Sequence, residues 1–195
     1  MKKIVLLLLT TFIFSEDIYV PDDFTLIQDA INYASDGDTI YVSEGTYYES
    51  YISLYNKTLT IIGEGPHTTI LDGQNNGSRC FYIDSPSETS FSISNFSIIN
   101  YNNSDGTAFH INGGNVSIDN SIIRNNTANN SIIHIDDGNT GDTNVSIIKT
   151  LIHDNTVSNP TNNYGAIVNY NNVNLILNFV TIAYNTKSAI HNVGG

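Results

Sequence analysis

Three carboxylates and two cationic side chains are near one another in the sequence, in the second half of the chain. Asp136, Asp137 and Asp142 fall within the stretch IDDGNTGDTN, and Arg124 and Lys149 lie on either side of it. Clustered carboxylates are ligands for a hard cation such as Ca²⁺, and a neighbouring Lys or Arg could act as a base. This set would suit a calcium-dependent lyase acting on uronate polysaccharides. The alternative is that Asp, Gly and Asn are present here to turn the chain.

The histidines form a second candidate set. His110 and His134 occupy the same place in two similar runs, AFHI and IIHI, and His191 follows another Ala-Ile pair. Imidazoles repeated in this way could form a metal-binding ladder, although histidines that simply face outward would give the same pattern.

Aromatic and sulfur side chains offer less specific chemistry. Tyrosines could provide stacking platforms for sugar rings, and part of the set must pack in the core. Cys80 is the only cysteine and lies in the apolar run CFYI, which favours burial over catalysis and excludes an intrachain disulfide. The tyrosines considered are Tyr47, Tyr48, Tyr51, Tyr164, Tyr170 and Tyr184.

Internal repeats must position these residues. Residues 116–126, 145–155 and 175–185 each contain two short apolar-alternating runs with a kink between them and an Asn at the end. A looser copy begins at Phe91, and successive starts are 25, 29 and 30 residues apart. Periods of this length are typical of stacked repeats that bury one continuous core. The expected inward-facing rows are Ile118 with Ile147 and Leu177, and Ile123 with Ile152 and Ile182.

The asparagine that ends each repeat has a predicted structural role. Stacked coils would place Asn126, Asn155 and Asn185 above one another at one sharp corner. Asn tolerates the left-handed conformation that such a corner needs, and stacked amides can form hydrogen bonds along the axis. These three residues are the predicted structural site. We assign no catalytic, metal-binding or cofactor-binding residue, and we expect no cofactor.

A single helix is predicted at about residues 25–35. Thr25 and Gln28 fit a capping box at its start, and Asp36-Gly37-Asp38 ends it. Such a helix would cover the open edge of the first strand layer. Its apolar stripe, at helical spacing, consists of Leu26, Ile27, Ala30, Ile31 and Ala34.

Residues 1–15 are predicted to be a signal peptide, because two lysines precede an apolar run that is too short to span a bilayer comfortably. An N-terminal anchor or a buried first strand are the alternatives. Residues 16–195 would form one domain without a membrane span, secreted or on the cell surface. The chain stops inside a repeat, so we expect either truncation of a longer protein or end-to-end self-association through the last coil.

Two regions resemble known families. The stretch TLIQDAINYASDGDTIYVSEGTYYE, with the later KTLTIIGEG and TILDG, resembles the N-terminal part of β-helix proteins of the pectin-lyase-like superfamily. The stretches GAIVNYNNVNLILNFVTIAYN and SAIHNVGG are similar to repeats of polymorphic outer-membrane and autotransporter-like β-helix proteins. The resemblance implies an all-β fold, a single-stranded right-handed parallel β-helix (solenoid) with an N-terminal capping α-helix.

Catalytic motifs of enzymes with this resemblance are missing. Pectin methylesterases share the first stretch, but residues 122–127 carry no carboxylate in the required position and no DFIFG-like segment follows. Polygalacturonase-like hydrolases need GHG and RIK motifs, which the chain lacks. Their paired carboxylates are not matched either, because the adjacent Asp136 and Asp137 would point to opposite faces of a strand. The sequence therefore favours a protein that is not an enzyme.

The charge balance limits the choice of partner. Nineteen acidic and seven basic residues give a net charge of −12, which argues against nucleic acid as a partner. The preferred hypothesis is an exported, non-catalytic surface or secreted protein that uses a long flat face for adhesion or for binding a polysaccharide or cell-surface glycan. The calcium-dependent uronate lyase and a structural β-helix segment of a larger surface protein are the alternatives.

Overall fold

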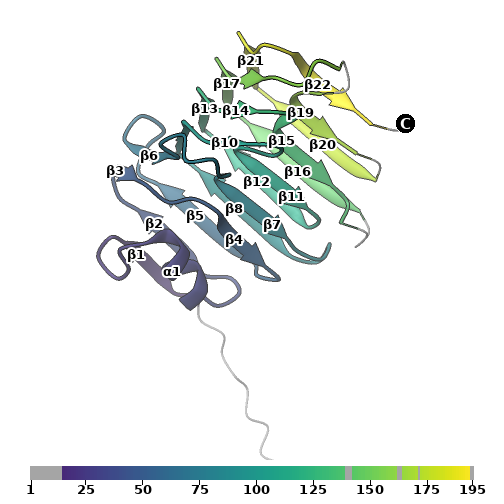
Figure 1. The fold of residues 1–195 in the computed structure, drawn as a ribbon. Helices are drawn as coiled ribbons and strands as arrows, with labels where there is room; N and C mark the ends of the chain where they lie inside the picture. The colour runs from purple at the N-terminus through teal and green to yellow at the C-terminus, as the bar shows by residue number, and fades with distance from the viewer. Residues whose placement is uncertain (1–14, 139–141, 162–163, 171, 194–195) are drawn as a thin grey trace, which may run out of the picture.

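The chain winds into a parallel β-helix in which each coil lies on the one before it (Figure 1). The computed structural model describes residues 15–138, 142–161, 164–170 and 172–193. Helix α1 (Ile27–Tyr33) lies at the N-terminal end of the stack, and the C-terminus lies at the other end. The predicted signal peptide lies outside the described residues except for Ser15. The predicted parallel β-helix with one capping helix is confirmed.

The longest sheet contributes a strand to every coil, and we call it the groove sheet for a reason given below. Its strands pair in parallel in the order β1-β2-β5-β8-β12-β16-β20 within the described residues. They are β1 (Asp17–Val20), β2 (Thr39–Val42), β5 (Leu59–Gly63), β8 (Ser90–Ser94), β12 (Asn115–Asp119), β16 (Thr143–Ile148) and β20 (Val173–Asn178).

A second parallel sheet carries the histidines and is called the histidine sheet. Its order is β4-β7-β11-β15-β19-β22 in the described part of the chain. The strands are β4 (Ile52–Tyr55), β7 (Phe81–Asp84), β11 (Phe109–Asn112), β15 (Ser131–Asp136), β19 (Gly165–Asn169) and β22 (Ser188–Asn192).

Two further sheets consist of shorter strands, the short-strand sheet and the corner sheet, and the corner sheet is present in only part of the stack. Both are again parallel. The short-strand sheet contains β3 (Gly45–Tyr47), β6 (Thr69–Asp72), β9 (Ser97–Ile99), β13 (Ile122–Arg124), β17 (Leu151–His153) and β21 (Thr181–Ala183). The corner sheet contains β10 (Asn102–Asn103), β14 (Thr127–Ala128) and β18 (Thr156–Val157).

Apolar side chains point into the coil and stack in register, as the repeats predict. The strand register confirms both expected inward rows. Burying each such side chain contributes about 1.5–3 kcal/mol. Leu177 and Ile182 are only half-buried, because they lie on the last described coil. From the first coil to the last, the groove-sheet row is Ile18, Ile40, Ile61, Ile93, Ile118, Ile147 and Leu177.

The predicted asparagine ladder is present, and its geometry repeats from coil to coil. Asn155 Oδ1 accepts hydrogen bonds from the backbone N–H of Asn126 at 3.0 Å and from Asn126 Nδ2 at 3.1 Å. Asn185 Oδ1 accepts the equivalent two bonds from Asn155, both at 3.0 Å. Each side chain also donates to a carbonyl of the preceding coil, Ile123 for Asn155 and Ile152 for Asn185. Each ladder asparagine therefore connects its own coil to the preceding coil by hydrogen bonds.

The expectation that the ladder asparagines themselves adopt the left-handed conformation is wrong. The residues with positive φ are the ones immediately before them, Asn125 (57°), Asp154 (54°) and Tyr184 (54°). The left-handed residue turns the chain sharply, so that the next side chain points into the coil. Asn126 and Asn155 are accordingly 1% exposed.

Tyr101 occupies the ladder position in the preceding coil. It follows the left-handed Asn100, and its backbone N–H donates to Asn126 Oδ1 at 2.9 Å. The buried phenol crosses the interior, and its hydroxyl donates to the Glu49 carbonyl at 2.5 Å. Gly73 is required beneath this ring, because a Cβ there would lie 2.5 Å from the ring carbon Cδ1.

The backbone groups at both ends of helix α1 form hydrogen bonds with side chains from later in the chain. The predicted capping box of Thr25 and Gln28 is wrong: α1 starts at Ile27 with Leu26 as its N-cap, and no side chain of the N-cap residue caps it. Instead, the Glu49 carboxylate accepts the backbone N–H groups of Ile27 at 2.7 Å and Gln28 at 3.0 Å. Of the predicted apolar stripe, Leu26 alone is 45% exposed, because it lies outside the helix.

Lys57 forms hydrogen bonds with the free carbonyls at the C-terminal end of α1. Its Nζ donates to the carbonyls of Ile31, Asn32 and Ala34 at 2.8, 3.0 and 2.7 Å. A cation is favourable at a helix C-terminus, where unpaired carbonyls carry partial negative charge. The helix is therefore held over the first coil by Glu49 at one end and Lys57 at the other.

Candidate functional site

A shallow groove of about 310 Å³ runs along the outer face of the groove sheet, across β5, β8, β12, β16 and β20. Strand alternation sends residues such as Val116 and Ile118 inward, so that the neighbouring Asn115 and Ser117 face the groove. No charged side chain lines the groove among the described residues. Its long axis crosses the strands, parallel to the axis of the coil.

One row of the groove consists of amides. Asn115, Asn144 and Asn174 pair in register on β12, β16 and β20. Asn144 Nδ2 donates to Asn115 Oδ1 at 2.9 Å, and Asn174 Nδ2 donates to Asn144 Oδ1 at 3.2 Å. This second amide ladder is open to solvent, since Asn144 and Asn174 are exposed.

The second row consists of hydroxyls, and we call it the hydroxyl row. Its members are half-buried and repeat at the strand spacing of about 4.8 Å. Within the described residues, none of their side-chain oxygens takes part in a hydrogen bond, so each is free to donate and accept. Ile176, 53% exposed, continues the row on β20. The hydroxyl row is Thr60, Ser92, Ser117 and Ser146.

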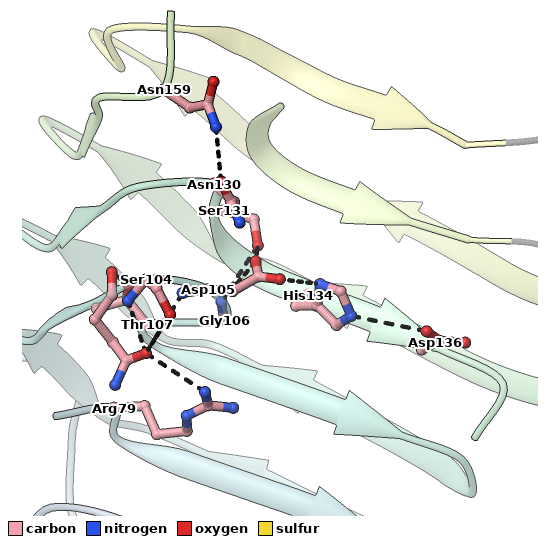
Figure 2. A network of polar contacts seen from close by, with 11 residues as sticks. Arg79, Ser104, Asp105, Gly106, Thr107, Asn130, Ser131, His134, Asp136 and Asn159 are labelled. Atoms are coloured by element: carbon pink, nitrogen blue, oxygen red, sulfur yellow. Dashed lines mark hydrogen bonds and ion pairs between the residues drawn. The ribbon is translucent and has the colours of Figure 1, made fainter. Parts of the chain in front are cut away.

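A second candidate site lies on the histidine sheet, where His134 stands between two carboxylates (Figure 2). Its Nδ1 is 2.9 Å from Asp105 Oδ2, and its Nε2 is 3.9 Å from Asp136 Oδ2. The Ser131 hydroxyl and the Gly106 backbone N–H both donate to Asp105 Oδ1. Asp105 comes from the loop before β11, whereas the other side chains come from β15, so the network joins adjacent coils.

The pKa values of two groups here are shifted. Burial alone raises the pKa of Asp105, but its contacts with His134 and Ser131 hold it below its ordinary value. Burial, with nearby His134 and Arg79, lowers the pKa of His110 to about 4. The Nδ1 atom of His110 is buried and has no hydrogen-bond partner among the described residues. Asp105 is therefore an anion and His110 a neutral ring at pH 7.

Aromatic rings stack along this sheet from coil to coil. Tyr82 lies 5.3 Å from His110, and His110 lies 4.4 Å from His134 at an interplanar angle of 11°. Tyr51 stacks on Tyr82 at one end, and Tyr170 contacts His134 at the other. The ring faces are turned toward one another, so the inner rings present mainly their edges outward. A sugar needs a free ring face to stack, and the inner rings of this row offer none.

The remaining predicted tyrosines are dispersed. Tyr47 and Tyr164 pack against the core. Tyr48 and Tyr184 are exposed at separate places in the coil, 64% and 86% respectively. Cys80 is fully buried as expected, and burial raises the pKa of its thiol.

The structure does not bring the predicted lyase residues together. Asp142 precedes β16 and Lys149 follows it, which separates them by roughly 20 Å of extended chain. Arg124 lies on the short-strand sheet. Asp136 faces His134, whereas Asp137 accepts a hydrogen bond from Asn172 at 2.9 Å, so the two neighbours have different partners.

The histidines of the repeated runs lie in one row of the histidine sheet. His110 and His134 pair in register, and His191 follows on the same line after Val168. Among the described residues, no group of three or more His, Cys, Asp or Glu side chains is arranged to hold a metal ion.

Sequence reasoning missed Asp105, Ser131 and the hydroxyl row. Asp105 and Ser131 are 26 residues apart, close to one repeat, so the period could have placed them on adjacent coils. The serines were also visible, as the second residue of FSIS, VSID and VSII. Their common outward direction follows from alternation once the register is known.

Comparisons of the chain with protein-family models, curated proteins and solved structures found no match. In the part of the chain that the structure describes, no helix has the length and apolar character needed to cross a membrane. The function must therefore be inferred from the two faces described above.

Proposed function

We propose that this protein is an exported, non-catalytic β-helix protein that binds an extended polysaccharide along the groove sheet. The observation that carries the proposal is the hydroxyl row, whose unpartnered hydroxyls repeat across four coils beside an exposed amide ladder. Polysaccharides present hydroxyls at regular intervals, and hydroxyl and amide side chains are suitable partners for them. Export rests on the sequence of residues 1–15 alone, and membership of the pectin-lyase-like superfamily rests on sequence resemblance alone.

The histidine sheet is a less suitable ligand-binding surface than the groove. The Asp105 carboxylate, the Ser131 hydroxyl and the His134 ring already contact one another. These contacts hold two coils together and occupy the carboxylate and the hydroxyl that a ligand would otherwise use. The groove, in contrast, has free polar groups and no competing internal contacts on its hydroxyl row.

A glycan array probed with residues 16–195 tests the proposal. Wild-type protein should bind at least one polysaccharide, and Ser117→Leu, which fills the middle of the groove, should weaken that binding by at least about tenfold, or 1.4 kcal/mol. Ser50→Leu is the matched control, because Ser50 is exposed in the loop before β4 and away from the groove. Failure of the folded wild-type chain to bind any glycan on the array would overturn the proposal.

A further inference from the structure

We infer that the groove takes a neutral, linear glycan that lies parallel to the coil axis with one sugar on each coil. This inference rests on the proposed function and names the ligand class for the same groove. Three features lead to it: the direction of the groove, the spacing of its polar groups, and the distribution of charge.

The direction comes from the strand register. The hydroxyl row and the amide row both cross the strands at right angles, and every step moves to the next coil. A ligand following the groove must therefore be extended, and it meets β5, β8, β12, β16 and β20 in turn.

The spacing comes from the backbone. Parallel strands lie about 4.8 Å apart, so Ser92, Ser117 and Ser146 present hydroxyls at that interval. An extended glycan of pyranose rings linked through opposite positions advances by nearly the same length for each sugar. A sugar on β12 or β16 can then meet one hydroxyl and one amide, whereas a sugar on β5 or β8 meets the hydroxyl row alone and a sugar on β20 meets the amide of Asn174.

The charge of the molecule selects against acidic glycans. The groove lining has no cation to pair with a carboxylate or sulfate, and the whole chain carries a net charge of −12. A polyanion lying across five coils would meet repulsion with no local compensation. A neutral glycan avoids this repulsion and uses the free hydroxyls.

The length of the groove fixes a length for the ligand. Five strands line it, so binding should involve about five sugars. Longer oligosaccharides would extend beyond the polar rows and would gain little.

Calorimetric titration with neutral oligosaccharides of increasing length, from the disaccharide upward, tests the inference. The series is taken from whichever neutral polysaccharide binds on the array. We expect affinity to rise with each added sugar up to about five and then to level off. An acidic series of matched lengths, built from galacturonate, should bind at least about tenfold more weakly at low ionic strength, with the difference narrowing as salt is added.

A shortened groove provides the matched variant. Ser146→Leu leaves Thr60, Ser92 and Ser117 accessible on three adjacent coils. Short oligosaccharides should keep their wild-type affinity for this variant, whereas affinity should stop rising at a shorter length. A merely destabilised variant would lose affinity at all lengths, which distinguishes the two explanations.

The outcomes separate this inference from the proposed function. Absence of any glycan binding would overturn the function itself. Binding that is independent of length, or strongest for a disaccharide, would overturn the one-sugar-per-coil arrangement and leave polysaccharide binding intact. Equal or tighter binding of the galacturonate series at low salt would overturn the choice of a neutral ligand.

Discussion

At the scale of single residues, Asn155 joins three coils through one side chain. Its Oδ1 accepts two hydrogen bonds from Asn126, and its Nδ2 donates to the Ile123 carbonyl and to Asn185 Oδ1. The side chain is 1% exposed, so water cannot replace these partners. Loss of a buried partner costs about 1–3 kcal/mol for each group left unpaired.

Asn155→Ala should therefore lower the free energy of unfolding by about 3 kcal/mol. Chemical denaturation followed by circular dichroism would measure it. Asn144→Ala is the matched control, because Asn144 also makes two amide–amide bonds but is exposed, and its loss should change stability by less than about 0.5 kcal/mol. Equal effects of the two substitutions would contradict a role for burial in the ladder.

His110 should make the stability of the protein sensitive to mild acid. Its pKa is about 4 in the folded chain, compared with an ordinary value of 6.5, and the groups that face it are His134, Arg79, Asp105 and the Tyr82 ring. Between these pH values the unfolded chain binds a proton on His110 that the folded chain does not. The free energy of unfolding should therefore fall as pH is lowered from 6.5 to 4.

Comparison with His110→Gln isolates this contribution. The variant cannot take up the proton, so its stability should fall less steeply over the same pH range, as measured by urea denaturation at each pH. Asp105, whose pKa lies below its ordinary value, takes up its proton mainly below this pH range. Parallel curves for wild type and variant would refute the assignment.

At the scale of elements, α1 depends on Glu49, a residue outside the helix. Glu49 is 8% exposed, and burial raises its pKa even though the Gln28 and Ile27 N–H groups counteract the shift. Substitution by Gln retains one acceptor oxygen, so one of the two N–H groups loses its partner.

Glu49→Gln should destabilise the protein by about 1–2 kcal/mol, and the amides of Ile27 and Gln28 should exchange with solvent faster. Hydrogen-exchange NMR would detect the local effect. The difference from wild type should not narrow in acid, because the raised pKa of Glu49 means that protonation of its carboxyl favours the folded chain. Glu88→Gln, at an exposed position, should change neither quantity.

Comparison of the elements with the sequence shows which features of the fold could be predicted. Regular repeats predict the inward rows and the ladder, because equivalent residues of each repeat occupy equivalent positions in each coil. The strand register confirms these predictions. The helix cap could not be predicted, because Glu49 reaches α1 from 22 residues later and local spacing favoured Thr25. The Asp105–His134 contact and the groove depend similarly on which coils are adjacent, which no local motif encodes.

At the scale of the whole molecule, charge is unevenly distributed between the ends of the coil. Residues 172–193, which include β20, β21 and β22, contain no Asp or Glu, although the chain has 19 such residues. Phe179 and Ile190 are 82% and 39% exposed there, and among the described residues β20, β21 and β22 are each the last strand of their sheet. Unpaired strand edges favour pairing with another chain.

We therefore predict that the 195-residue chain associates end to end through this coil at high concentration. Sedimentation velocity should reveal dimers, and Ile182→Lys on β21 should shift the population toward monomers. Thr181→Lys on the exposed outer side of the same strand is the control and should leave the dimers in place. A strictly monomeric wild-type chain at all concentrations would rule out the association.

The asparagine ladder has a consequence for how such a molecule can change in size. Because each rung bonds only to its immediate neighbours, duplication of one coil would insert a layer without altering the layers on either side. The groove would lengthen by the same step, adding one more hydroxyl and one more amide. Genetic gain or loss of a single coil would thus adjust the reach of this surface in units of one sugar, while the ends of the protein stayed unchanged.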